Sequence, residues 1–156
     1  MIALLKEFYL LDNVLKRLLQ IGVLALTLSL CYWSACPFLG ELYSASGDAY
    51  VNNKKPYIAL GYYLKGLSYD SLNPKLYQKA GLLYLDLSRI EKNPEYMEEG
   101  IALLLKAVPL TGKPSLDYSL GTAFESMKES EKAQFYFQRA FERSGGTVAK
   151  NKIKNK

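Results

Sequence analysis

Few residues in this chain could carry out chemistry. The sequence has no histidine, and histidine is the usual general base, a common metal ligand and the usual partner of a serine or cysteine nucleophile. The acidic pairs Glu98–Glu99 and Glu129–Glu131 lack a second polar group that would complete an acid–base site, and the positive ends of helices explain them. The glycines are dispersed and form no phosphate-binding loop. We therefore predict that the protein is not an enzyme and that it holds no metal or cofactor.

The two cysteines, Cys31 and Cys36, lie five residues apart in an apolar segment. On a helix this spacing places them on different faces, so we expect no disulfide between them. A lipid anchor at Cys36 is an alternative use, because the small residues Ser34 and Ala35 precede it. Trp33 stands where a lipoprotein signal would have an aliphatic residue.

The net charge of +5 is concentrated at the ends of the chain. Acidic and basic residues balance over residues 40–149, whereas Lys150, Lys152, Lys154 and Lys156 crowd the C-terminus. A basic face that could follow a nucleic-acid backbone is not indicated, so we predict no nucleic-acid partner. Residues 148–156 are interpreted as a basic, disordered tail, with contact to anionic lipid or an acidic partner as the alternative.

No residue from Leu18 to Gly40 is charged. About 20 mostly apolar residues are enough to cross a bilayer, and the aromatic residues Tyr32 and Trp33 are typical of its interface. Pro37 is expected to stop or kink the helix. We predict a transmembrane or signal-anchor helix over residues 18–39, and residues 1–17 are either an amphipathic helix at the membrane surface or simply a flank.

The charges beside the apolar segment predict its orientation. Lys16 and Arg17 precede it and Glu41 follows it, so the positive-inside rule places the N-terminus in the cytoplasm. The rest of the chain then lies on the extracytoplasmic side, in the periplasm or its equivalent. This holds whether the segment is retained, cut before an acylated Cys36, or removed as a secretory signal.

Large and small residues recur at helical spacing in three copies behind this segment. Small residues let two antiparallel helices approach closely, and aromatic residues fill the space between them. Gly47, Gly81 and Gly121 occupy equivalent positions, 34 and 40 residues apart. The three sets are Tyr43, Ser46, Gly47, Tyr50, Ala59, Tyr63 and Gly66; Tyr77, Ala80, Gly81, Tyr84, Gly100, Leu104, Ala107 and Gly112; and Leu120, Gly121, Phe124, Ala133, Phe137, Ala140 and Gly145.

This pattern resembles the tetratricopeptide repeat (TPR). The resemblance implies an all-α domain over residues 40–147, with three helix-turn-helix pairs (about 40–73, 74–113 and 114–147) in a right-handed solenoid. The extra residues of the second copy fall around residues 89–95, where one helix is expected to turn into the next. The pattern's tryptophan is replaced by Tyr43, Tyr77 and Asp117.

The resemblance also implies a concave groove that is lined by the first helix of each pair. Carried over to this chain, the groove would be mildly acidic with an apolar middle, and Asp48 and Glu125 would repel the C-terminal carboxylate that the chaperone-binding subgroup recognises. The predicted groove residues are Ser44, Asp48, Val51, Gln78, Leu82, Leu85, Asp86, Ser119, Thr122 and Glu125.

We therefore predict a membrane-tethered protein-protein interaction module, a scaffold or assembly factor of the cell envelope. A lipoprotein or a self-assembling structural component is the alternative, and an enzyme subunit that binds a small ligand in the groove is less favoured. Phe141 is predicted at the end of the array, where it either forms an exposed apolar contact for a partner or a second copy, or folds back as core.

Overall fold

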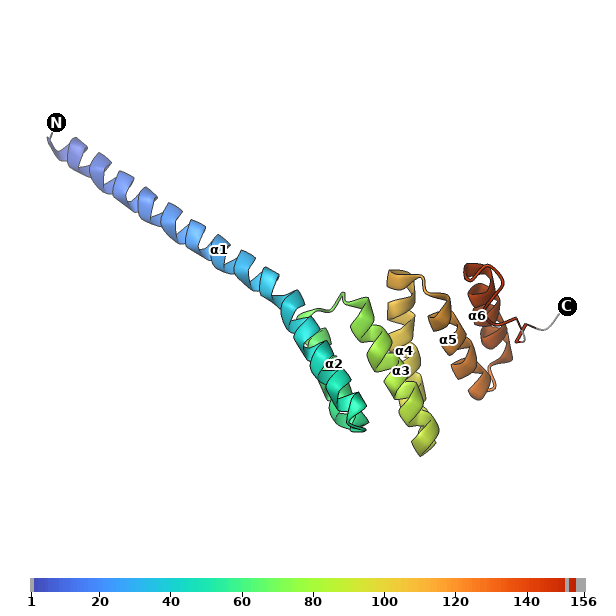
Figure 1. Ribbon diagram of the computed structural model, residues 1–156. Coiled ribbons are helices and arrows are strands. Elements are labelled where there is room, and N and C mark those ends of the chain that lie inside the picture. The colour runs from blue at the N-terminus through green and yellow to red at the C-terminus, as the bar shows by residue number, and fades with distance from the viewer. Residues whose placement is uncertain (1, 151, 154–156) are drawn as a thin grey trace. The chain divides into compact units, whose positions relative to one another are not determined.

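The computed structural model describes residues 2–150, 152 and 153, with side chains from residue 15 onward. These residues form helices and no strand, which confirms the all-α prediction (Figure 1). The helices are α1 (Ile2–Asn52), α2 (Pro56–Tyr69), α3 (Pro74–Glu91), α4 (Pro94–Thr111), α5 (Pro114–Ser126) and α6 (Ser130–Arg143).

The chain divides into one unit up to Phe38 and a second unit from Leu39 onward. The first unit consists of α1 up to Phe38. Within the described residues, the span Leu15–Asn52 is the one helix that is long and apolar enough to cross a membrane, and none of its most apolar stretch is buried. The predicted N-terminal flank covers residues 1–17, and the side chains of residues 1–14 lie outside the described residues.

Helix α1 continues through Pro37, so of the two effects expected of this proline, a stop or a kink, the stop does not occur. A proline inside a helix removes one backbone hydrogen bond, to the carbonyl of the fourth residue before it. The bonds on either side remain available, and apolar helices that cross membranes tolerate such breaks.

The second unit contains three helix pairs whose starts are set by local sequence signals. Each helix from α2 to α5 has proline in its first turn, where the missing N–H has no helical partner to lose. The Asn73 side chain accepts hydrogen bonds from the backbone N–H groups of Lys75 and Leu76, and Asn93 accepts one from Glu95. Both asparagines are therefore N-caps.

The middle pair is longer than the third pair. Helices α3 and α4 have 18 residues each, whereas α5 has 13 and α6 has 14. Only Lys92 and Asn93 separate α3 from α4, so the extra residues lengthen both helices rather than the turn. Helix α4 also passes Pro109 and ends at Thr111.

The equivalent glycines lie where the two helices of a pair approach each other. A Cβ atom at Gly121 would lie 2.6 Å from ring atoms of Phe137, and one at Gly81 would lie 3.0 Å from the Gly100 carbonyl oxygen. At Gly47 a Cβ would overlap the ring of Tyr63. Each contact pairs a small residue with a large residue or with backbone, as the repeat pattern predicts.

Two core clusters fill the second unit. The longer α3–α4 pair contributes residues to both clusters. The N-terminal core cluster comprises Ala59, Leu60, Tyr63, Leu76, Ala80, Leu87 and Leu103. The C-terminal core cluster comprises Leu85, Ile101, Leu104, Ala107, Val108, Leu116, Leu120, Ala123, Phe124, Ala133, Phe137, Ala140 and Ala149.

Candidate partner-binding surface

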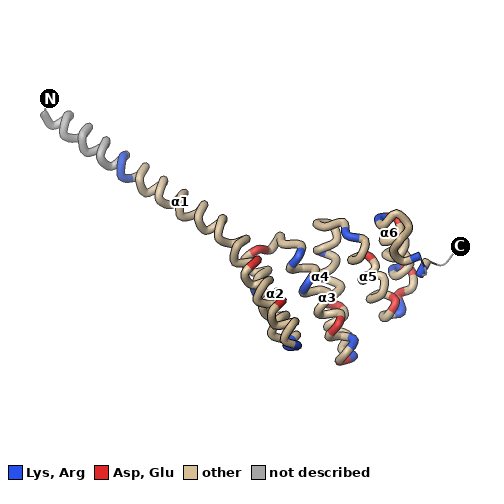
Figure 2. The backbone as a smooth tube through the Cα atoms, in the orientation of Figure 1, with Lys and Arg blue, Asp and Glu red and all other residues tan. Residues whose placement is uncertain are grey.

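The first helices of the three pairs are neighbours. They are residues 41–52 of α1, then α3, then α5, and we call their solvent-accessible side the first-helix surface. We call the boundary between two successive helix pairs a seam. At the first seam the Lys75 ammonium lies 3.2 Å from the Glu41 carboxylate. Lys113, just before α5, donates a hydrogen bond of 3.1 Å to the Gln78 side chain on α3. Residues 41–52 of α1 and all of α5 carry acidic but no basic side chains, whereas α3 carries both (Figure 2).

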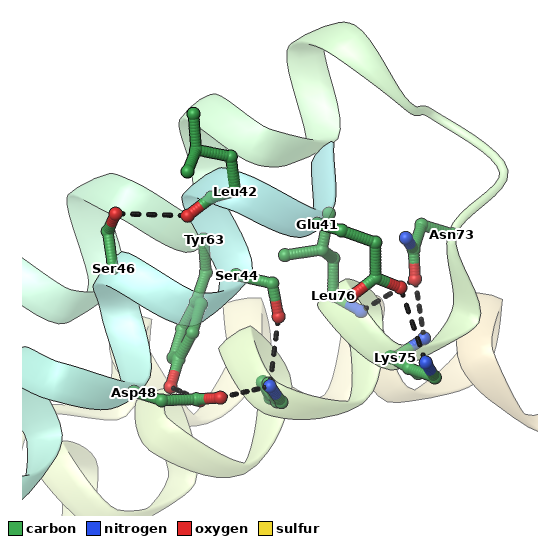
Figure 3. A network of polar contacts seen from close by, with 10 residues as sticks. Glu41, Leu42, Ser44, Ser46, Asp48, Tyr63, Asn73, Lys75 and Leu76 are labelled. Atoms are coloured by element: carbon green, nitrogen blue, oxygen red, sulfur yellow. Dashed lines mark hydrogen bonds and ion pairs between the residues drawn. The ribbon is translucent and has the colours of Figure 1, made fainter. Parts of the chain in front are cut away.

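A polar network joins α1, α2 and α3 at the first seam (Figure 3). The Lys79 ammonium donates to the Ser44 hydroxyl at 2.9 Å and lies 2.6 Å from the Asp48 carboxylate. The Tyr63 hydroxyl donates to the other Asp48 oxygen at 2.7 Å. Both oxygens of Asp48 are therefore used within the protein.

The network shifts the pKa values of two of its members. Burial alone would raise the pKa of Asp48, but the hydrogen bonds from Lys79 and Tyr63, with the Lys79 charge, lower it overall. Burial raises the pKa of Tyr63, and the hydrogen bond to Asp48 and the Asp48 charge raise it further. The tyrosine is thus held neutral and the aspartate charged.

Two of the predicted groove residues are buried. Ser44 is 2% exposed and Leu85 is 1% exposed. Leu85 lies four residues after Gly81, on the side of α3 that faces α4, and belongs to the C-terminal core cluster. Each helix is rotated about its axis so that these two side chains face the protein interior. Neither residue can therefore contact a partner in this arrangement.

The other predicted residues lie on the first-helix surface, where the acidic ones are paired with basic side chains. Asp86 pairs with Arg89 at 3.1 Å, and Glu125 pairs with Lys152 at 2.7 Å. Ser119 and Thr122 donate hydrogen bonds to carbonyls of their own helix. Together with Asp48 and Gln78, described above, they form a surface of paired charges around apolar side chains.

Each first helix contributes an accessible apolar side chain to this surface. Val51 is 41% exposed, Tyr118 is 36% exposed, and Leu82 is half-buried against the C-terminal core cluster. Sequence reasoning found Val51 and Leu82 but missed Tyr118. It also missed the lysines of the seams, although the repeat length gave a signal, since Lys75 follows Glu41 by 34 residues.

Two recesses are lined mainly by residues of the second helices α4 and α6, and neither was predicted. One, of about 380 Å³, is lined by Tyr84, Glu95, Tyr96, Glu98, Glu99 and Ala102. The other, of about 490 Å³, is lined by Leu105, Phe124, Glu131, Lys132, Phe135 and Tyr136. Among the described residues, no group of three or more cysteine, aspartate or glutamate side chains is placed to hold a metal ion.

Phe141 and the C-terminal tail lie closer to the core than the sequence suggests. Phe141 is half-buried, and a Cβ at Gly146 would lie 3.4 Å from its ring. The expectation of a disordered tail is wrong for its described part, because Val148 and Ile153 pack against the C-terminal core cluster and Ala149 is 9% exposed. These aliphatic side chains gain from burial although lysines surround them.

Stacked helix pairs with a small residue at each crossing define a helical-repeat protein. No protein-family model matches the sequence, and no curated protein matches it. Solved structures of TPR domains do resemble it. The first TPR domain of Spaghetti (RPAP3), bound to the HSP90 peptide SRMEEVD, aligns with a TM-score of 0.63 and 20% identity over 74% of this chain and 87% of that chain.

Two further structures are similar to the same degree. The Arabidopsis OM64 TPR domain has a TM-score of 0.63 and 19% identity over 74% of this chain and 92% of its own. MamA has a TM-score of 0.62 and 21% identity over 73% of this chain and 63% of the MamA chain. The chain therefore has the TPR fold, which confirms the resemblance drawn from its repeats.

Proposed function

We propose that the protein is a membrane-tethered interaction module that binds a protein segment on its first-helix surface. The observation that carries this proposal is the row of accessible apolar side chains Val51, Leu82 and Tyr118, one from each first helix. Paired charges surround the row. A segment with apolar residues at matching intervals would bury this row, and the surrounding ion pairs would fix its register.

The TPR domain of RPAP3 binds a peptide that ends in acidic and apolar residues. We do not extend that ligand to this chain. A clamp for a terminal carboxylate needs cations that are not already neutralised, whereas Lys75 faces Glu41 and Lys79 faces Asp48. An uncharged or mixed-charge segment fits this surface better.

Partner capture with two matched variants tests the surface. Leu82→Glu places a charge in the apolar row, and Leu110→Glu makes the same change at a half-exposed position on α4, away from it. A partner cross-linked to the unmodified full chain in detergent extract should also bind the Leu110→Glu chain, and its affinity for the Leu82→Glu chain should fall at least tenfold. Binding unaffected by Leu82→Glu would reject this surface.

The tether is proposed from the uncharged stretch Leu18–Gly40 and the length of α1. The full chain should stay in the membrane fraction after alkaline carbonate extraction, and removal of residues 1–39 should release the repeats. A chain that anchors through acylated Cys36 would instead lose its membrane association in a Cys36→Ser variant. The charges Lys16 and Arg17 favour an extracytoplasmic scaffold or assembly factor, which protease protection in sealed vesicles would test.

A further inference from the structure

The chain reverses direction after α6 and returns to the last helix pair. Gly145 and Gly146 have φ values of 62° and 87°, which glycine adopts without strain. The Gly146 N–H bonds the Phe141 carbonyl, and the Val148 N–H bonds the Ser144 hydroxyl. The segment that follows is directed back to the surface of α5.

A lysine and an aliphatic residue, adjacent in the sequence, make the contacts there. The Lys152 ammonium lies 2.7 Å from the Glu125 carboxylate and 5.8 Å from the centre of the buried Phe137 ring. Ile153 packs against the C-terminal core cluster. The nearby Tyr118 adds to the electrostatic surroundings of Lys152, whose pKa is raised mainly by its hydrogen bond to Glu125.

This contact resembles the seams between helix pairs in one respect, because a lysine from a later segment again meets a polar side chain of a first helix. Lys75 and Lys113 meet Glu41 and Gln78 in the N-terminal parts of their first helices. Lys152 instead meets Glu125 one residue before the end of α5, so the tail lies against the C-terminal end of that helix. A short segment with an exposed ion pair holds this place weakly, since such pairs add little stability.

We propose that Tyr118, Glu125 and Phe137 form a binding site for a protein segment that carries a lysine beside an aliphatic residue. The chain's own Lys152–Ile153 occupies the site until a partner segment displaces it. Because Glu125 and Tyr118 belong to the first-helix surface, this inference rests on the proposed function. It gives the partner a chemical character at the third pair and makes the tail its intramolecular competitor.

Binding of a tail peptide in trans tests the proposal. The probe is a fluorescent peptide with the sequence of residues 147–156, followed by anisotropy against the full chain in detergent and against a variant that ends at Gly146. The shortened chain should bind the peptide at least about fivefold more tightly, because a tethered segment competes at a millimolar effective concentration. Equal binding by both chains would overturn the proposal.

Three controls separate this site from charge attraction and from misfolding. In the shortened chain, Glu125→Lys should abolish peptide binding, whereas Glu131→Lys, the same charge change on α6, should leave it unchanged. A full-length chain with Lys152→Glu and Ile153→Ser keeps the length of the tail and should bind the added peptide as the shortened chain does. Binding that ignores Glu125, or a full-length double variant that behaves like the unmodified chain, would reject the site.

The failure of this proposal can be distinguished from the failure of the proposed function. Leu82→Glu lies outside the tail site, so it should weaken the partner and leave peptide binding intact. If Leu82→Glu abolishes partner binding but the peptide binds neither the full nor the shortened chain, the tail site alone is rejected. If peptide binding depends on Glu125 but partner binding is unchanged by Leu82→Glu, the apolar row alone is rejected.

Discussion

The most direct test of the helix packing is the substitution of alanine for glycine at two positions. Gly121 and Gly61 both lie inside helices, α5 and α2. A Cβ at Gly121 would lie 2.6 Å from two atoms of the Phe137 ring, whereas a Cβ at Gly61 would meet nothing within 4 Å. Gly121→Ala and Gly61→Ala therefore differ only in what the added methyl group meets.

The magnitudes follow from two opposing terms. Alanine in place of glycine inside a helix contributes about 0.8–1.0 kcal/mol through helix propensity, and this gain applies to both variants. Carbon atoms pack at about 3.5–4.0 Å, so the Phe137 ring would have to move by about 1 Å. Phe137 is 2% exposed and closely packed, and overpacking of this kind typically costs about 1–3 kcal/mol.

We expect Gly61→Ala to be more stable than the unmodified chain and Gly121→Ala to lie about 1–3 kcal/mol below Gly61→Ala. The difference isolates the steric term because the propensity gain cancels. Urea unfolding of the full chain in detergent, followed by circular dichroism, measures both variants. In thermal melts each kcal/mol corresponds to about 4–8 °C for a domain of about 100 residues, and Gly121→Leu should lose more than Gly121→Ala. Equal shifts for the two alanine variants would show that Gly121 does not lie at the helix crossing.

Three further outcomes are expected from the ionisable groups. The double variant Arg139→Ala/Arg143→Ala leaves the fully buried Asp117 carboxylate without its two partners and should lower the free energy of unfolding in urea by about 3–5 kcal/mol. Asp117→Ala should cost less, because both arginines are partly exposed and can rehydrate. A larger loss for Asp117→Ala than for the double variant would contradict this. Because the folded pKa of Tyr63 is raised above its ordinary value of about 10, the unfolded chain loses this proton first and the free energy of unfolding should fall above about pH 10, an effect that Tyr63→Phe removes. Because the folded pKa of Asp48 is lowered, its contribution to the free energy of unfolding should be present above about pH 4 and be lost as the pH falls through the folded pKa. The loss should be small because the carboxylate is half-exposed. Urea unfolding at a series of acidic pH values measures it, and Asp48→Asn should not show this loss.

Much of the fold could be predicted from the sequence because its signals are local. The spacing of Gly47, Gly81 and Gly121 follows from the need for small residues at each crossing, and the structure places all three there. The helix starts at Asn73 and Asn93 follow from capping, which depends on a few neighbouring residues. Signals of this kind do not depend on how distant parts of the chain are arranged.

Helix ends at prolines could not be predicted in the same way. Pro37 was expected to stop or kink its helix, yet α1 continues through it, as α4 continues through Pro109. The cost of a proline is the loss of one hydrogen bond together with a local clash, and whether a helix continues depends on the packing of the residues beyond it. Beyond Pro37 the second unit holds residues 39–52 by their contacts with α2 and α3.

The candidate surface was harder to predict than the fold, because a template position fixes a helix face only approximately. A rotation of α3 that places Leu82 on the surface buries Leu85, although both were assigned to the groove. Some of the surface's acidic residues pair with lysines far along the chain, as Asp48 does with Lys79 and Glu125 with Lys152, so a count of acidic residues did not show which of them are paired. Searching for oppositely charged residues one repeat apart would have paired Lys75 with Glu41.

Asp117 shows how a departure from the pattern can keep the fold. It stands where the repeat has tryptophan, in a position that is 0% exposed, where an isolated carboxylate would be strongly unfavourable. Arg139 donates to one of its oxygens from Nε at 2.9 Å, and Arg143 donates to the other at 2.8 Å. The arginines lie four residues apart, one turn of α6, so both reach the same carboxylate. An acidic residue at a large apolar position, with two basic residues at this spacing on the partner helix, is thus a sequence signal for a buried ion network. The third helix pair replaces aromatic packing with that network and retains the crossing at Gly121.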